Sequence, residues 1–212
     1  MNVKSKIKTT LRWLLWGIGS VSAVCVGLII ADTLHTKTCS APALEGKIIE
    51  VPGERMEVLS SGDVLSLDVV REPFSDPNYD LPAADGHIHP HQEERFEILE
   101  GRARFLIGDQ DVVLTPGQIG IVPPNTLHHW MALDGKPVHV KAEFAPALDT
   151  GAWFLHFQGH IAQGDMDLLQ AAVISSEYEE GAPLPVSPPP AFLKVLVKIL
   201  APVGRLLGYS AC

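Results

Sequence analysis

The chain has 212 residues, which suit one domain with extensions, and its formal net charge is −9. The charge is uneven: residues 1–40 are net +4, residues 41–180 hold 8 basic and 24 acidic residues, and residues 181–212 are net +3. A body this acidic repels a phosphate backbone, so the composition excludes nucleic acid as a partner.

Residues 13–31 form an uncharged stretch of 19 residues, close to the roughly 20 apolar residues that cross a bilayer. Four basic residues lie in the preceding segment 1–12, and the first acid is Asp32. The positive-inside tendency predicts a single-pass transmembrane anchor, with residues 1–12 in the cytoplasm and the body on the extracytoplasmic (periplasmic or extracellular) side. A cleaved signal peptide, whose apolar region is typically about 7–15 residues, and a buried core helix are the competing interpretations. Residues 32–47 are polar and contain Pro42, as expected of a tether.

The three cysteines are Cys25, Cys39 and Cys212, and no two of them have the CxxC spacing of a metal site. A Cys39–Cys212 disulfide is compatible with a body outside the cytoplasm, where disulfides persist. The sequence alone does not decide whether this bond forms.

Short apolar or alternating runs, separated by glycine, proline, asparagine and aspartate, fill residues 48–147. Many short strands at this spacing predict an all-β sandwich or barrel. Asp134-Gly135 lies between two such runs and predicts a β-hairpin. The expected strands are residues 56–59, 64–70, 95–99, 103–107, 112–114, 119–122, 128–133 and 138–144.

Two histidines lie two residues apart in the stretch GHIHPHQEERFEILEG, residues 86–101. Side chains two apart on a strand point to the same face, so His87 and His89 can direct their imidazoles to one point. A carboxylate follows at Glu94. Two imidazoles and a carboxylate are a common ligand set for non-haem iron, manganese or zinc.

A second stretch, GQIGIVPPNTLH at residues 117–128, adds a further histidine. Together the two stretches resemble the paired motifs of the cupin superfamily, over residues 55–144. The resemblance implies a double-stranded β-helix, the cupin jelly-roll barrel, and a divalent metal ion, which is iron, manganese, nickel or zinc. The implied metal ligands are His87, His89, Glu94 and His128. The competing interpretation is that these are ordinary polar residues on a strand surface.

Gly101 and Pro123 also match the cupin motifs, whereas three positions differ. Leu81 replaces the opening glycine of the first motif, Asn125 replaces the inner glycine of the second, and Ala132 replaces its closing asparagine. Asparagine tolerates a left-handed turn, so Asn125 is a mild departure. At the other two positions the resemblance does not imply the usual role of the family residue.

Strand alternation predicts which side chains face the barrel interior. If Glu94 points inward, so do Phe96 and Ile98, and if His128 points inward, so does Trp130. These three apolar residues would flank the metal as substrate-binding residues, which suits a flat aromatic or otherwise apolar ligand. Simple packing of the barrel is their alternative role.

The residues between the histidine pair and Glu94 are expected at the mouth of the barrel. His91 lies past Pro90 and is expected at the rim. Gln92 and Glu93 are expected to be turn residues.

Residues 148–180 are expected to form a helical extension, with a helix at residues 166–178 capped by Asp165. His156 and His160 are four residues apart, a spacing that can hold zinc on a helix. No third ligand follows them, so packed or solvated histidines are the expected state.

Residues 181–190 hold five prolines and are expected to be an extended linker. Residues 191–209 then predict an amphipathic helix, bent or broken at Pro202 and Gly204. This helix either covers a face of the barrel or a dimer partner, or lies on a membrane surface. The layout also resembles membrane-anchored bacterial cupins with helical carboxyl-terminal tails.

Two functions remain open because the fold alone does not determine one. The first is a metal-dependent oxidoreductase of dioxygenase type acting on a small aromatic molecule, with Glu94 also acting as a base. The second is a non-catalytic module, tethered to the membrane, that binds a sugar-like or metal-chelating ligand. Isomerase or epimerase activity ranks below these, and a homodimer is expected because cupin dimers are common.

Overall fold

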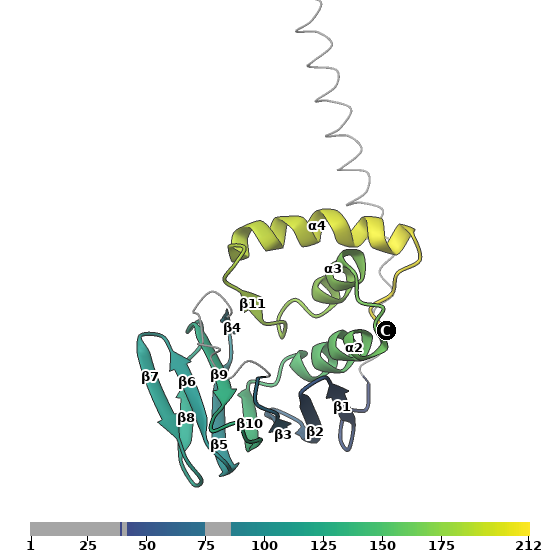
Figure 1. The fold of residues 1–212 in the computed structure, drawn as a ribbon. Helices are drawn as coiled ribbons and strands as arrows, with labels where there is room; N and C mark the ends of the chain where they lie inside the picture. The colour runs from purple at the N-terminus through teal and green to yellow at the C-terminus, as the bar shows by residue number, and fades with distance from the viewer. Residues whose placement is uncertain (1–38, 40–41, 75–85) are drawn as a thin grey trace, which may run out of the picture.

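The structure, a computed structural model, describes residues 39, 42–74 and 86–212. These residues form two antiparallel β-sheets and three helices (Figure 1). No helix in this described part is long and apolar enough to cross a membrane. The predicted span at residues 13–31 lies outside the described residues, as does Leu81.

The two sheets contain strands from distant parts of the sequence. The first sheet has the order β1-β2-β3-β10-β5-β8. Its strands are β1 (Ile48–Val51), β2 (Glu54–Ser61), β3 (Leu65–Arg71), β10 (Val138–Ala145), β5 (Glu93–Glu100) and β8 (Ile119–Val122). The second sheet has the order β11-β4-β9-β6-β7. Its strands are β11 (Leu184–Pro185), β4 (His87–Ile88), β9 (His128–Ala132), β6 (Ala103–Ile107) and β7 (Gln110–Leu114).

Between β3 and β10 the chain passes repeatedly from one sheet to the other. This alternation is the arrangement of a double-stranded β-helix, so the predicted jelly-roll fold is confirmed. In β10, Val138, Val140, Ala142 and Phe144 are buried, and the residues between them are only partly buried. Each large apolar side chain that is buried in this way stabilises the fold by about 1.5–3 kcal/mol.

The hairpin prediction at Asp134-Gly135 is wrong. Both residues have positive φ, 60° and 63°, and Lys136 N–H donates to the Leu133 carbonyl, so the chain does turn here. However, β9 pairs with β4 and β6 in one sheet, whereas β10 pairs with β3 and β5 in the other. The dipeptide determines a local reversal, but the partners of each strand are decided by which faces they bury.

The helices are α2 (Thr150–Gln163), α3 (Leu168–Glu177) and α4 (Pro190–Leu206). The amino-terminal cap of α3 is Asp167, whose carboxylate accepts from Gln170 N at 2.8 Å. The predicted cap, Asp165, instead accepts from His160 Nδ1 at 2.8 Å. The helix therefore begins two residues later than its apolar pattern predicts, where a side chain can reach the third backbone N–H.

Residues 181–190 are not merely a linker, because they contain β11, which pairs with β4. Helix α4 begins at Pro190, a favoured residue for a first helical turn, and continues through Pro202 to Leu206. The predicted break is therefore absent. Gly204 lies where α4 meets α3, since a Cβ there would be 2.7 Å from Val173 Cγ2. Its lack of a side chain permits close helix packing instead of ending the helix.

In Figure 1, α2 lies next to the sandwich, α3 lies beyond it and α4 is outermost. A second apolar core joins these helices, with Val173 and Ile174 of α3 completely buried. The two ends of the described chain meet here, because Cys39 and Cys212 form a disulfide. Cys39 N–H also donates to Glu177 Oε1 at 3.0 Å.

Candidate metal centre

Strand pairing brings two histidines together on one sheet. His87 of β4 lies directly opposite His128 of β9 in the ladder, and their ring centroids are 4.3 Å apart. His89 follows β4, and its carbonyl accepts from Asn125 N at 2.8 Å. Asn125 has φ 58°, the left-handed conformation that the sequence predicts for it. The second motif thus fixes the backbone of the first.

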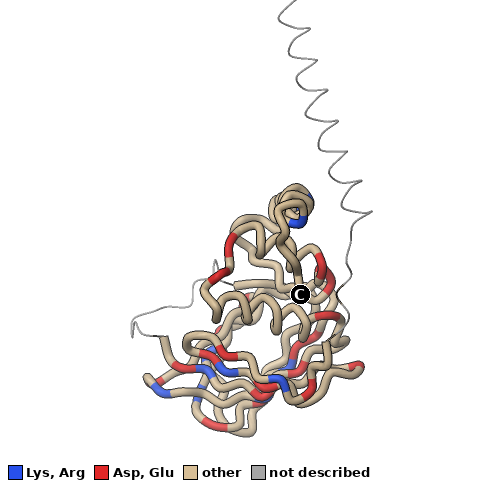
Figure 2. Tube along the Cα trace, turned by 90° about the vertical axis from the view of Figure 1, so that its right-hand side faces the viewer, with Lys and Arg blue, Asp and Glu red and all other residues tan. Residues whose placement is uncertain are grey.

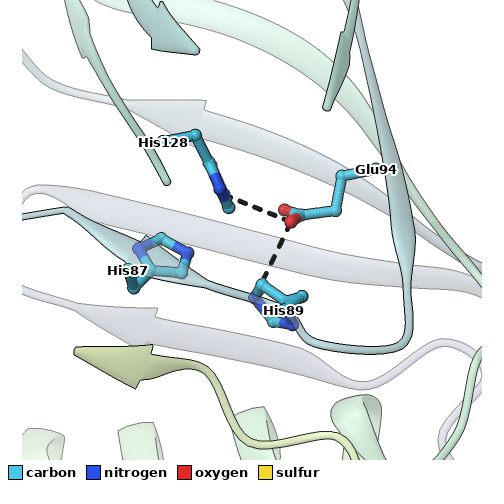
Figure 3. Close-up of side chains that lie close together, drawn as sticks. All are labelled: His87, His89, Glu94 and His128. Carbon is cyan, nitrogen blue, oxygen red and sulfur yellow. Dashed lines mark ion pairs between the residues drawn. The ribbon is translucent and has the colours of Figure 1, made fainter. Parts of the chain in front are cut away.

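The carboxylate comes from the other sheet. Glu94 is near the start of β5, and its side chain is buried between the sheets. Its Oε1 is 3.2 Å from His128 Nε2 and 3.9 Å from His89 Nε2 (Figure 3). The ligand atoms of all four residues, including His87, lie within 4.8 Å of one another. The structure therefore brings together the four residues that the motifs identify.

Three of these atoms are buried polar atoms without a hydrogen-bond partner: His89 Nε2, Glu94 Oε1 and His128 Nε2. Buried polar groups are almost always paired, and these three unpaired atoms also converge on one point, as the ligand atoms of a metal site do. Each would bind a divalent ion at about 2.0–2.2 Å, so a small inward movement brings the set to bonding distance. The residues present fit a divalent metal.

The other nitrogens of two imidazoles are already engaged. Nδ1 of His128 donates to the Thr126 carbonyl at 3.1 Å, and Nδ1 of His89 donates to Gln92 Oε1 at 2.9 Å. These bonds place the hydrogen on Nδ1 and leave the Nε2 lone pair of each ring facing the centre.

Burial also favours the neutral form of His87 and His89. Desolvation, followed by the neighbouring His128 and His89, holds the pKa of His87 well below its usual value. Desolvation likewise lowers the pKa of His89, although the Glu94 carboxylate opposes the effect. Neutral imidazole is the form that binds a metal, so the site needs little deprotonation to receive one.

Gln92 contacts the candidate centre, although its position in the sequence predicts only a turn residue. It is buried, not in a turn at the mouth, and its Oε1 orients the His89 ring. Its Nε2 donates to the carbonyls of Pro146 and Ala147 and lies 2.8 Å from Thr150 Oγ1 at the start of α2. A glutamine two residues before the motif carboxylate has no local pattern to mark it, because the partners of its Nε2 are more than 50 residues away.

Thr150 extends this network into the carboxyl-terminal region. Its hydroxyl donates to the Gly181 carbonyl at 3.0 Å. A Cβ at Gly181 would collide with the backbone of Asp149 and Thr150, so only glycine fits there. The four buried residues Gln92, Thr150, Ala147 and Gly181 form what we call the amide cluster, and they connect the barrel to α2.

A cavity of about 180 Å³ opens beside the metal ligands. The predicted substrate-binding residues Phe96 and Trp130 line it, whereas Ile98 is completely buried in the core opposite Val140 and does not. The aromatic residues of the cavity wall are Phe96, Trp130, Phe144, Trp153 and Phe154.

Arg71 and Glu54 add charge to this cavity. The Arg71 guanidinium lies 3.7 Å from the Trp130 ring centroid and donates to the Trp130 carbonyl at 3.0 Å. Its Nη2 also forms an ion pair with Glu54 at 2.8 Å. The ion pair and the bond to the Trp130 carbonyl hold the guanidinium over the indole at the cavity wall.

Three other histidines of the described chain, His91, His156 and His160, lie outside the centre. His91 is exposed, as expected of a rim residue. His156 stacks on Tyr178 with centroids 5.6 Å apart, and His160 pairs with Asp165. The expectation that this pair is packed or solvated is confirmed.

A family model described as the cupin domain matches residues 82–144. The match supports the cupin superfamily. No curated protein matches the chain. Among solved structures, KdgF from Halomonas sp. is 19% identical with a TM-score of 0.40, over 47% of this chain and 87% of that one. A sugar phosphate isomerase from Silicibacter pomeroyi is 17% identical with a TM-score of 0.39, over 49% and 71%. Lactobacillus farciminis oxalate decarboxylase is 16% identical with a TM-score of 0.39, over 47% and 31%.

Proposed function

We propose that this cupin is a metal-dependent oxidoreductase of dioxygenase type that acts on a small aromatic molecule. The observation that supports it most is the set of three buried, unpaired ligand atoms beside an aromatic cavity. A redox-active ion held by His87, His89, Glu94 and His128 would supply Lewis acidity and electron transfer to dioxygen. Dioxygen is then the oxidant, and no external reductant is required.

The residues of the chain have distinct roles in this proposal. Phe96 and Trp130 supply an apolar wall for a flat ring, and the Arg71 guanidinium, paired with Glu54, covers a face of the Trp130 indole. Glu94 accepts the proton of a phenolic substrate on a carboxylate oxygen. The enclosing aromatic side chains exclude water from the reacting groups.

The first experiment is elemental analysis of the full chain purified in detergent, comparing wild type with His89→Ala. His91→Ala is the matched control, because that histidine is exposed and outside the centre. We expect near-stoichiometric iron, manganese, nickel or zinc in the wild type and control, and none in His89→Ala. Equal metal content in His89→Ala and His91→Ala would contradict the metal centre.

The second experiment measures dioxygen uptake with a panel of phenolic and flavonoid compounds. Uptake by the wild type but not by His89→Ala supports the oxidoreductase. A compound that raises the melting temperature without consuming dioxygen supports the alternative, a tethered binding module. The binding module is favoured by the Arg71–Glu54 ion pair in the cavity wall. Because these two groups are paired with each other, neither adds an unpaired acid or base to the four candidate metal ligands.

The proposal also places the cupin domain outside the cytoplasm, anchored by residues 13–31. The basic segment 1–12 supports this orientation, and so does the Cys39–Cys212 disulfide, since disulfides persist in oxidising compartments. Protease added to intact spheroplasts is expected to digest the domain. Protection of the domain until the membrane is lysed would contradict this orientation.

A further inference from the structure

Helix α4 presents an apolar stripe to solvent. Phe192, Val195, Ile199 and Leu206 are 57%, 58%, 51% and 65% exposed. Residues three, four and seven apart lie on one face of a helix, so these side chains form a single stripe along its length. The opposite face is already occupied, because Ala201 and Gly204 are buried near α3. The stripe therefore does not contribute to the packing of the helices, and it is available to bind a partner.

A basic edge flanks the stripe. Lys194 and Lys198 are exposed and one turn apart, and α4 contains no acidic residue. Arg205 is not part of this edge, because it forms an ion pair with Glu177 of α3 at 3.3 Å. Figure 2 shows α4 at the end of the molecule away from the sheets, where blue positions occur without red ones. An outward face that is apolar along one side and basic along the other is typical of helices that lie in a membrane interface.

The covalent structure holds this helix near the predicted anchor. Glu177 accepts from Cys39 N–H at 3.0 Å and pairs with Arg205 in the last turn of α4. The Cys39–Cys212 disulfide closes the same corner. Cys39 is eight residues beyond the end of the predicted span at residue 31, a distance of at most about 29 Å. The last turn of α4 is therefore confined close to any bilayer that residues 13–31 cross.

We infer that the exposed face of α4 docks on the surface of an anionic bilayer, which orients the cupin domain on the membrane. The charge pattern favours lipid over a second copy of the chain, because two such helices would bring Lys194 and Lys198 against their own counterparts with no acid on α4 to pair them. The inference uses the proposed anchor, and the experiments below distinguish the failure of one from the failure of the other.

The test places a tryptophan on the stripe of the full chain, reconstituted in nanodiscs of phosphatidylethanolamine and phosphatidylglycerol with brominated acyl chains. The Phe192→Trp variant is expected to lose at least about half of its added fluorescence to bromine quenching, because the side chain lies at the level of the acyl chains. Ile121→Trp is the matched control, since Ile121 is 46% exposed on β8 of the barrel. Its added fluorescence should be unaffected. Equal quenching of the two variants would overturn the inference.

The basic edge is tested in the Phe192→Trp background. Each lysine near an anionic surface is worth about a five-fold change in the docking equilibrium, so K194E/K198E should weaken docking by at least about 25-fold and abolish most of the quenching. Quenching that is unchanged by this double substitution would overturn the electrostatic part of the inference. Absent quenching together with two copies per disc would assign the face to a second copy instead.

Carbonate extraction of wild-type membranes reports on the anchor separately. Protein that resists carbonate but shows no quenching of Phe192→Trp contradicts the docking of α4 and supports the anchor. Protein that carbonate releases, while Phe192→Trp remains quenched, contradicts the anchor and supports the docking.

Discussion

The amide cluster and three of the candidate metal ligands, His89, Glu94 and His128, are two buried polar groups that lie side by side and differ in one respect. Each polar atom of the Gln92 amide has a hydrogen-bond partner within about 3 Å. In contrast, the atoms of His89, Glu94 and His128 that face the centre have none. The two groups are in contact through the bond between Gln92 and His89.

This difference distinguishes the residues that stabilise the fold from those that can bind a ligand. A fully paired buried network stabilises one arrangement of the chain, whereas unpaired buried atoms keep a desolvation penalty that a ligand can remove. In the proposed metal centre the amide cluster would therefore orient His89, and the unpaired atoms would bind the ion. The four predictions below test that division, in order of decreasing effect on the free energy of unfolding.

Gln92→Ala is expected to have the largest effect. It removes the Gln92 donor from the Pro146 carbonyl and one of the two donors from the Ala147 carbonyl, which keeps only Thr150 N–H at 3.3 Å. It also creates a buried cavity, so the free energy of unfolding should fall by about 3–4 kcal/mol. Metal affinity should also fall by about 10–100-fold, because the His89 ring loses its orienting bond. Urea denaturation and competition with a chelator measure the two changes.

Gln118→Ala, in an exposed turn, is the control and should change stability by less than about 0.5 kcal/mol. Equal losses in both variants would contradict a structural role for the amide cluster.

Cys212→Ser removes the disulfide that closes a loop with a sequence separation of 173 residues. We expect the free energy of unfolding to fall by about 3 kcal/mol, because the unfolded chain is no longer constrained. Metal content should not change, since the bond lies beyond the helices and away from the centre. Urea denaturation with and without reductant, combined with elemental analysis, tests both statements. Cys25→Ser is the control, and a loss of metal in Cys212→Ser would show that the two regions are coupled.

Metal removal should lower stability by about 2.7 kcal/mol relative to protein with free metal at 100 times its dissociation constant. The unpaired atoms of the centre then return to their unsatisfied state. For a domain of this size the melting temperature should fall by about 5–10 °C, which calorimetry with and without chelator measures. His91→Ala should retain this dependence and His89→Ala should lose it. Identical melting of the wild type in both conditions would argue against a bound ion.

Glu94→Met should have the smallest effect and the opposite sign. Without metal, the wild-type carboxylate is buried with an unpaired oxygen, so an apolar residue of similar volume should leave stability unchanged or raise it by about 1 kcal/mol. Urea denaturation of both proteins in chelator measures this difference. A loss as large as that of Gln92→Ala would mean that Glu94 serves the fold and not a ligand.

Much of the barrel and of the centre was predictable because the signals are local. Alternation along β5 and β9 correctly placed Phe96 and Trp130 on the buried face with Glu94 and His128. Ile98 follows the same alternation, yet it lies too far along β5 to line the cavity. Alternation determines which face a side chain occupies but not its depth in the barrel.

The carboxyl-terminal region was less predictable. Helices α2, α3 and α4 follow their apolar patterns, but the prolines of residues 181–190 concealed β11. That strand forms only because β4 offers it a free edge. Similarly, Gly204 looked like a helix break and is a contact with α3.

The sequence by itself determined the jelly-roll class, the direction of the motif side chains and the left-handed turn at Asn125. These features depend on strand periodicity and on the φ preferences of single residues, which involve only near neighbours. The tertiary structure alone decided that Asp134-Gly135 joins two different sheets, that Gln92 supports the centre, and that α4 leaves an apolar stripe exposed. These outcomes depend on which distant surfaces bury one another, and burial between segments 50 or more residues apart has no local signature.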